Sequence, residues 1–362
     1  MGGLRFLFGV HDWGLGHATR DLVLIRALLK AGHEVTVLSA SRAMRLLRSE
    51  LGQECDYVEL PDIPKPLSRY PALFYVKMSL SMPLVFATWR REQKLVRSLC
   101  AQRRFDRIVS DTRFGVFHPE IPSYFLVHSL RQIIPGRPRG LETMVERHQH
   151  KMFSVVRKVL IPDEEENGLA GDLCHNLALD WSDRLAYIGV LSSVRRQSCE
   201  QDIDYFITVS GAEPQRTFFE KVVLEQAPRL RGRVVVTLGR PERVPSSVRV
   251  GRVSVHTYMN REQQEEMLNR ARLVVSRSGY TTLMELAELG RRALFVPTVG
   301  QSEQEYLGAH HERQGAMHTV VQSKVDLARD VVAAEAYRGP PKVAGTSTSV
   351  ERFLSIVCGD GA

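Results

Sequence analysis

Two glycine-containing segments carry residues whose types and spacing could do chemistry. The first lies near the N-terminus, where Gly14 and Gly16 precede His17. Glycine allows tight turns and close approach of the backbone to a ligand, and the helix predicted to begin at about His17 would offer free N–H groups to an anion. The segment therefore predicts an anion-binding loop. No acidic residue stands at the end of the next predicted strand, over 37–40, which counts against dinucleotide binding.

His17 is a candidate general base, because the pKa of an unperturbed imidazole is about 6.5 and suits removal of a proton from a hydroxyl. The alternative is a polar residue that merely begins a helix. Asp111 follows a predicted strand over 107–110 and should lie at the same sheet edge. There it could orient His17, bind an acceptor, or simply cap a turn. His11 and His128 follow two other predicted strands and are further candidates on this acceptor side.

The second segment combines a strand end, a glycine turn and the start of a helix. Its candidate residues are Arg277, Ser278, Gly279, Thr281, Thr282 and Glu285. Backbone N–H groups, hydroxyls and the helix dipole can neutralise a diphosphate without a metal, and Ser278 or Thr281 could cap the helix. Glu285, a turn further on, could accept both hydroxyls of a ribose, or it could merely complement the helix dipole.

Two neighbouring loops carry further candidates for the same ligand. After a strand predicted over 205–210 come Ser210, Gly211 and Arg216, which we expect near the donor. After a strand predicted over 293–296 come acids and an amide at a helix start, which suit the hydroxyls of a sugar. These residues are Glu303, Gln304 and Glu305.

The elements that must position these loops alternate between strand and helix in both halves of the chain. Near-continuous apolar strands separated by amphipathic stretches predict parallel sheets covered on both faces. We therefore expect an α/β fold of two Rossmann-like doubly wound domains, over 1–190 and 203–348, facing across a cleft. A helix over 349–362 could pack back on the N-terminal domain. Such sheets bind ligands beyond the carboxyl ends of their strands.

Composition narrows the class of protein. The 362 residues include 49 Lys+Arg and 41 Asp+Glu, and the formal net charge of +8 favours anionic partners. No nucleic-acid-binding motif is present, so nucleic acid is not an expected partner. Five scattered cysteines without a C-x-x-C pair predict a reducing, cytoplasmic location. No cluster of metal ligands stands out, and we predict neither a metal nor a cofactor.

An apolar stretch over 70–89 approaches the length that spans a bilayer, but it contains Pro71, Lys77 and Pro83. We expect a pair of helices there instead of a span. The basic residues that follow would suit peripheral docking on anionic lipid at the inner face of the membrane. The alternative is a core helix with a solvated end. These residues are Arg90, Arg91, Lys94, Arg97, Arg103 and Arg104.

The sequence resembles the MurG-like, family 28-like group of GT-B glycosyltransferases, which transfer a sugar from UDP to a lipid-linked acceptor. Nearly the whole chain is covered, but the motifs are strong only in patches. The family's glycine loop matches Gly14-Leu15-Gly16-His17, and its Arg-Ser-Gly-x-x-Thr-x-x-Glu element matches 277–285. Its sugar-binding glutamine pair falls on Gln304 and Glu305, and the glutamate at the second position leaves the donor sugar open.

The resemblance implies a metal-independent, inverting transfer of a hexose or N-acetylhexosamine from a UDP-linked donor to a hydroxyl acceptor, lipid-linked or glycan. It implies that Glu285 contacts ribose and that Tyr258 and Met259 lie where the base is read. Two rivals stay open. Nucleotide-sugar hydrolases or epimerases with a Gly-His-x-x-Arg loop look similar around 16–20, and a non-catalytic nucleotide-sugar or lipid-binding protein would carry the same donor loop.

Overall fold

The computed structural model describes residues 3–12, 15–62, 71–211, 213–240 and 244–359, with side chains from 80 onward in the third range. The chain forms two compact units. Unit 1 comprises Met1–Pro66, Val76–Ser193 and Ala344–Ala362, and unit 2 comprises Leu67–Tyr75 and Val194–Val343. The C-terminal segment thus belongs with the N-terminal half of the chain.

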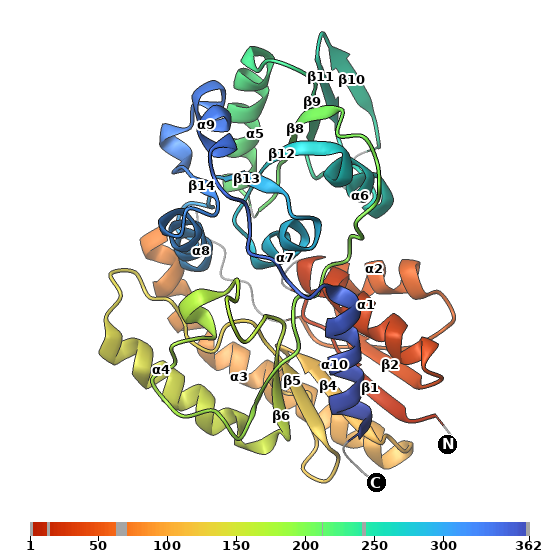
Figure 1. The fold of residues 1–362 in the computed structure, drawn as a ribbon. Coiled ribbons are helices and arrows are strands. Elements are labelled where there is room, and N and C mark those ends of the chain that lie inside the picture. Colours follow the sequence, from red (N-terminus) through yellow and green to blue (C-terminus); the bar gives the residue numbers. More distant parts are fainter. Residues whose placement is uncertain (1–2, 13–14, 63–70, 212, 241–243, 360–362) are drawn as a thin grey trace. The chain divides into compact units, whose positions relative to one another are not determined.

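Unit 1 is built on one parallel sheet (Figure 1). In spatial order its strands are β3 (Asp56–Glu59), β2 (Glu34–Ser39), β1 (Arg5–Gly9), β4 (Arg107–Asp111), β5 (Ser123–Leu126), β6 (Lys158–Ile161) and β7 (Leu185–Tyr187). Its helices are α1 (Leu15–Lys30), α2 (Ser41–Leu51), α3 (Pro71–Gln102), α4 (Arg139–Met152) and α10 (Thr346–Gly359). In β1, Leu7 packs in one hydrophobic cluster with Leu38, Val96 and Ile108. Phe8 points to the opposite face and is also fully buried, as parallel sheets require.

Unit 2 repeats the plan with a second sheet, in which only the edge strand runs antiparallel. In spatial order its strands are β10 (Ser247–Val250), β11 (Val253–His256), β9 (Val234–Thr237), β8 (Ile203–Thr208), β12 (Ala271–Ser276), β13 (Arg292–Phe295) and β14 (His318–Thr319). Its helices are α5 (Gln215–Gln226), α6 (Arg261–Arg270), α7 (Tyr280–Leu289), α8 (Ser302–Arg313) and α9 (Leu327–Glu335). Ile207, Val275 and Leu294 bring three neighbouring strands into one core.

Each sheet has a point at which the strand order reverses. In unit 1 the chain builds outward from β1 through β2 and β3, then returns to β4 on the other side of β1. In unit 2 the same reversal separates β8 from β12. Ligands bind in open α/β sheets at the carboxyl ends of the strands that flank such a reversal. The candidate loops of the sequence follow these strands in both units.

The apolar stretch around Pro83 departs from expectation. It forms part of the single helix α3, with Pro83 inside, so the predicted helix pair is wrong. Proline removes one backbone hydrogen bond and bends a helix, but it need not end it. Among the described helices, none has both the length and the apolar character needed to cross a bilayer.

The C-terminal helix α10 packs against α1 in unit 1 (Figure 1). Phe353 and Val357 on α10 are fully buried. Arg352 forms an ion pair with Glu164 at 2.9 Å, and the Thr346 hydroxyl accepts a hydrogen bond from the backbone of Ser192 at 2.9 Å. The first and last segments of the chain therefore fold as one body.

Candidate active site

The centre of the unit 1 site is a contact between His17 and Asp111. Because α1 begins at Leu15, His17 lies in its first turn, and Asp111 is the last residue of β4. The Nδ1 atom of His17 lies 2.8 Å from Asp111 Oδ2. The side chain of Asp111 is fully buried, whereas 21% of the His17 side chain is exposed. A histidine held at one nitrogen by a buried carboxylate and still open to solvent can serve as a general base.

A buried arginine one turn along α1 completes this contact. Arg20 donates to Asp111 from Nε at 3.1 Å and from Nη2 at 2.5 Å. The same guanidinium lies 2.9 Å from His17 Nδ1 and 3.2 Å from His128 Nδ1. The sequence pattern included Arg20 but gave it no role. Its spacing of three residues from His17, which places both on one helix face, was the available signal.

Three histidines gather at this edge of the sheet. The ring centroid of His17 lies 4.9 Å from that of His11 and 6.0 Å from that of His128. The structure therefore brings together His11, His17, His128 and Asp111, which the sequence placed at separate strand ends. Gly16 lies in the first turn of α1, where its carbonyl accepts the Thr19 hydroxyl. Gly14 lies outside the described residues.

Burial and charge together set the protonation of this site. Burial lowers the pKa of His17, Asp111 opposes that shift and Arg20 adds to it. Burial and the neighbouring His17 lower the pKa of His11 further. Although burial alone would raise it, Arg20 and His17 hold the pKa of Asp111 well below its usual range. Burial and the charge of Asp111 raise the pKa of Asp21. Near neutral pH, neutral imidazoles thus face an ionised Asp111.

A second buried arginine fixes the loops around the site. Arg113 pairs with Asp12 at 2.9 Å and with Glu92 at 3.2 Å, and it donates to the carbonyl of Pro61 at 3.2 Å. It therefore ties the loops after β1, β3 and β4 to α3. Glu92 also accepts a hydrogen bond from the backbone of Gly115 at 3.1 Å. This cluster could not be predicted from the sequence, because no local pattern links residues 12, 92 and 113.

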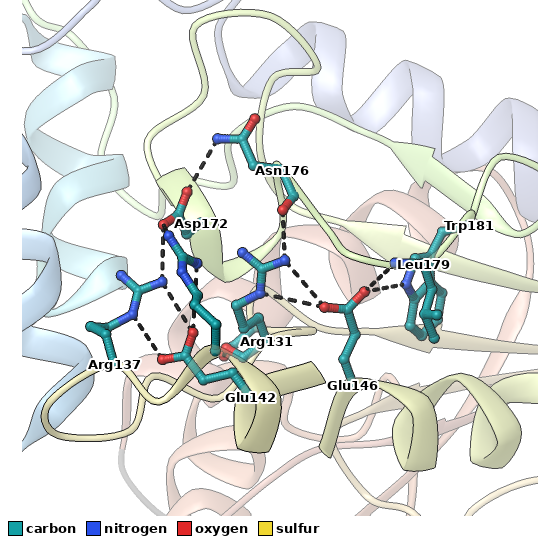
Figure 2. A network of polar contacts seen from close by, with 10 residues as sticks. Arg131, Arg137, Glu142, Glu146, Asp172, Asn176, Leu179 and Trp181 are labelled. Carbon is teal, nitrogen blue, oxygen red and sulfur yellow. Dashed lines mark hydrogen bonds and ion pairs between the residues drawn. The ribbon is translucent and has the colours of Figure 1, made fainter. Parts of the chain in front are cut away.

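A polar network holds the loop that follows His128 (Figure 2). Arg131 donates to Glu146 of α4 at 3.2 Å and to the carbonyl of Asn176 at 2.6 Å. The other oxygen of Glu146 accepts from the backbone of Leu179 at 2.8 Å and from the indole of Trp181 at 3.3 Å. Glu146 is fully buried, so α4 is anchored to the site loop by charge as well as by packing.

In unit 2, the side chain of Arg277 is buried among the loops that the sequence predicts to bind the donor. It is almost fully buried and donates to the carbonyls of Val296, Pro297 and Gln215 at 2.8, 3.1 and 3.0 Å. It also lies over the ring of Phe219, 4.2 Å from the centroid. Burial lowers its pKa to about 10. Arg277 therefore fixes the loops after β8, β12 and β13 relative to one another.

The start of α7 differs from the predicted cap. Its N-cap is Gly279, and neither Ser278 nor Thr281 caps it, because the Ser278 hydroxyl donates to the carbonyl of Gln304 at 2.8 Å. The predicted cap is therefore wrong. Thr281 and Thr282 lie half-buried in the first turn. Among the described residues, no side chain caps this helix with a hydrogen bond.

Gly211 and Thr298 form a second feature of these loops. Gly211 has a φ of +112°, and a side chain there would come within 3.4 Å of the Thr298 hydroxyl. Thr298 is buried, and its hydroxyl has no hydrogen-bond partner within the described part of the chain. Buried polar groups are rarely left unsatisfied. The neighbouring Ser210 is exposed.

Other predicted donor residues are engaged within the protein. Glu285 pairs closely with Arg261, and Arg216 pairs with Glu220 at 3.0 Å and closely with Glu213. Gln304 accepts from the backbone of Thr298 at 2.9 Å, while the exposed Glu305 accepts from that of Gly300 at 2.8 Å. Hydrogen bonds thus join the loops that carry Arg277, Ser278 and Gln304. Three further candidates lie elsewhere in unit 2 or beside these loops. Those are the half-buried Tyr258, the buried Met259 and the half-buried Glu303.

One group in the described residues has the types and spacing of a metal site, namely Asp163, Cys174 and His175. Asp163 already accepts from the backbones of Leu169 and Ala170 at 2.7 and 2.9 Å and from His175 Nε2 at 3.0 Å. Gly168 packs so closely that a side chain there would lie 2.3 Å from His175 Nε2. The carboxylate therefore organises a loop. In unit 2, the D-x-D residues Asp202 and Asp204 pair with arginines.

Two segments of the chain match known protein families. Residues 207–334 match the glycosyltransferase family 28 C-terminal domain, and residues 4–59 match glycosyl transferase family 1. An uncharacterized glycosyltransferase of Methanosarcina acetivorans is 24% identical over 361 residues, covering 92% of both chains.

Solved structures share the fold at low identity. The glycotransferase of kitacinnamycin superposes with a TM-score of 0.63 at 15% identity, over 99% of this chain and 95% of its own. A structure assigned as a UDP-N-acetylglucosamine 2-epimerase from Listeria monocytogenes has a TM-score of 0.60 at 14% identity, over 98% and 96%. The family match, the relative and the fold together identify the chain as a GT-B glycosyltransferase similar to family 28.

Proposed function

We propose that the enzyme transfers a hexose or N-acetylhexosamine from a nucleoside diphosphate sugar, with UDP favoured, to a hydroxyl acceptor, without a metal and with inversion. The observation that carries the proposal is the contact of 2.8 Å between His17 and Asp111 at a partly open sheet edge. The pair resembles the base and its orienting carboxylate in other hydroxyl-activating sites.

The reaction follows from the roles of these groups. The acceptor hydroxyl loses its proton to His17, and its oxygen forms a bond to the anomeric carbon. The bond between that carbon and the diphosphate oxygen breaks, and the electron pair leaves with the nucleoside diphosphate. Attack opposite to the leaving group inverts the configuration. Asp111 then stabilises the imidazolium that His17 becomes, as a buried carboxylate beside it would.

The donor diphosphate would bind at the loops of unit 2. The start of α7, with Gly279 as its N-cap, lies at these loops, and the Thr298 hydroxyl would offer a hydrogen-bond donor there. A helix N-terminus stabilises developing negative charge without a cation.

The acceptor would be lipid-linked or a glycan. Leu80, Leu84 and Phe86 of α3 expose 75%, 62% and 39% of their surface. Exposed cations follow on the same helix at Arg90, Arg91, Lys94 and Arg97. Apolar side chains beside basic ones suit docking on anionic lipid. This surface supports a cytoplasmic enzyme bound peripherally at the inner face of the membrane.

The first test is thermal stabilisation by UDP, dTDP, GDP and NAD, with Glu285→Ala and the exposed-site control Glu225→Ala. Ligand at 100 times its Kd should stabilise the native state by about 2.7 kcal/mol. We expect a shift with UDP that Glu285→Ala removes and Glu225→Ala keeps. A shift with NAD alone, or with none of the four, would contradict the donor assignment.

Turnover and binding measurements on the same protein distinguish the two rival functions. A nucleotide-sugar hydrolase or epimerase would consume UDP-sugar without any acceptor, whereas a transferase would do so only slowly. A binding protein would be stabilised by UDP, would turn over no acceptor, and would be indifferent to loss of His17. Because the fold hosts transferases and an epimerase alike, only such turnover measurements choose between these reactions.

A further inference from the structure

The guanidinium of Arg20 contacts three ionisable side chains around the His17 site. It is 1% exposed and reaches Asp111, His17 and His128 at once. A guanidinium only donates hydrogen bonds and does not lose its proton in proteins. Any ring nitrogen that bonds to it must therefore be an acceptor, and this requirement constrains both histidines.

For His128 the constraint fixes the tautomer. Its Nδ1 atom lies 3.2 Å from Arg20 Nη1 and can bond only through its lone pair. In the neutral ring the proton then resides on Nε2. His128 thus offers an N–H donor at Nε2. The contact of its other nitrogen, Nδ1, with Arg20 selects this tautomer.

For His17 two demands compete at one atom. Nδ1 lies 2.8 Å from Asp111 Oδ2, which requires a proton there, and 2.9 Å from Arg20 Nη2, which requires a lone pair. When His17 is protonated, Nδ1–H can donate to Asp111, but the imidazolium then lies beside the guanidinium. Asp111 supports the protonated ring and Arg20 opposes it. In this setting Asp111 helps His17 to accept a proton, and Arg20 favours its release.

We propose that Arg20 is a positioning residue: it holds Asp111 against His17 and fixes His128 as the tautomer that carries its proton on Nε2. The site would then contain one base and one neutral donor. This role rests on the proposed function of His17, yet the readout below needs no turnover and can fail separately. The groups that face His17 are Asp111 from β4, Arg20 from α1, His128 after β5 and His11 after β1.

The test is an NMR titration of the histidine rings in the full-length, ¹⁵N-labelled chain. Signals are assigned by their loss in His17→Asn and His128→Asn. In Arg20→Gln we expect the His17 titration to move to higher pH, because a neighbouring cation is lost. We expect the His128 ring nitrogens to change from one tautomer to a mixture. Arg107→Gln is the control, since Arg107 is also buried in unit 1 but bonds to Val357 of α10.

A second variant covers the case in which Arg20→Gln does not fold. Arg20→Lys keeps the charge, but one ammonium cannot reach three partners in the fork geometry. It should leave the His17 titration low and still release the His128 tautomer. An unchanged His128 tautomer in either folded Arg20 variant would overturn the proposal. So would an equal change in Arg107→Gln, because the effect would then be general destabilisation.

Discussion

At the scale of single residues, the proposed chemistry depends on where one proton sits on His17. The ring is neutral near physiological pH because burial and Arg20 lower its pKa, while Asp111 keeps it oriented. A neutral imidazole can take a proton at once, whereas a protonated one must first lose its own. The same features that make this position costly for a charge therefore make it useful for a base.

Replacement of His17 should separate catalysis from donor binding. We expect His17→Ala to lower kcat by a factor of about 10² to 10⁴, the usual contribution of a positioned base. The thermal shift with UDP should persist, because the donor loops belong to unit 2. The change in kcat is measured from initial rates of UDP release, with an acceptor that the wild-type enzyme glycosylates. Equal rates in wild type and variant would remove His17 from the mechanism.

The lowered pKa of His17 also predicts how stability varies with pH. Below about pH 6.5 the unfolded chain binds a proton on this ring that the folded state excludes, so stability falls as the pH drops through that value. Asp21, with a raised pKa, contributes with the opposite sign. Because Asp21 is present in both proteins, its contribution to the pH dependence cancels when wild type is compared with His17→Gln. Urea unfolding between pH 5 and 8 should show a weaker acid loss in the variant, and parallel curves would contradict the assignment.

At the scale of elements, strand ends were the most predictable part of the molecule. His17, Asp111 and His128 follow apolar strands, and parallel strands bring their ends to one edge. The contacts that orient them could not be predicted, because Arg113 joins Asp12 and Glu92 across long separations in sequence. Strands β6, β7, β10 and β14 were also missed. β10 and β14 lack the apolar runs that identify β1 or β12, whereas β6 and β7 carry short ones, over 159–161 and 185–187, that were overlooked.

Errors at two helices have physical causes. The proline in α3 suggested a break, yet a helix continues past Pro83 because neighbouring turns keep their bonds. The hydroxyls near α7 suggested a cap, but Ser278 bonds across to Gln304 of α8. At α7 a local rule gave way to a tertiary contact, which a single sequence does not record.

Helix α4 should depend on its buried carboxylate. Glu146 holds Arg131, Leu179 and Trp181 (Figure 2). Glu146→Ala leaves Arg131 buried without its ion-pair partner, and loss of one member of a buried pair costs about 3–5 kcal/mol. The control is Glu120→Ala at an exposed position, where changes stay within about 0.5 kcal/mol. Urea unfolding measures both, and similar small losses would show that the network is not needed for α4.

At the scale of the whole molecule, the chain passes from unit 1 to unit 2, and its C-terminal segment belongs to unit 1 again. The loops proposed to bind the donor lie within unit 2, over 194–343, whereas the His17 cluster and α10 lie within unit 1. Each unit has its own sheet and its own buried core. Stability and ligand binding can therefore be assigned to the units separately, and perturbation of α10 offers a way to test this.

Phe353 is fully buried on α10. Truncation of a buried phenylalanine to alanine costs about 3–5 kcal/mol through lost burial and the cavity left behind. We expect Phe353→Ala to lower the unfolding transition of unit 1, while the transition that UDP raises, assigned to unit 2, keeps its midpoint. Calorimetry with and without UDP separates the two. Ser355→Ala, at an exposed position of the same helix, is the matched control. If Phe353→Ala lowered both transitions equally, the units would unfold as one cooperative body, and α10 would stabilise the donor domain as well as the domain that holds His17.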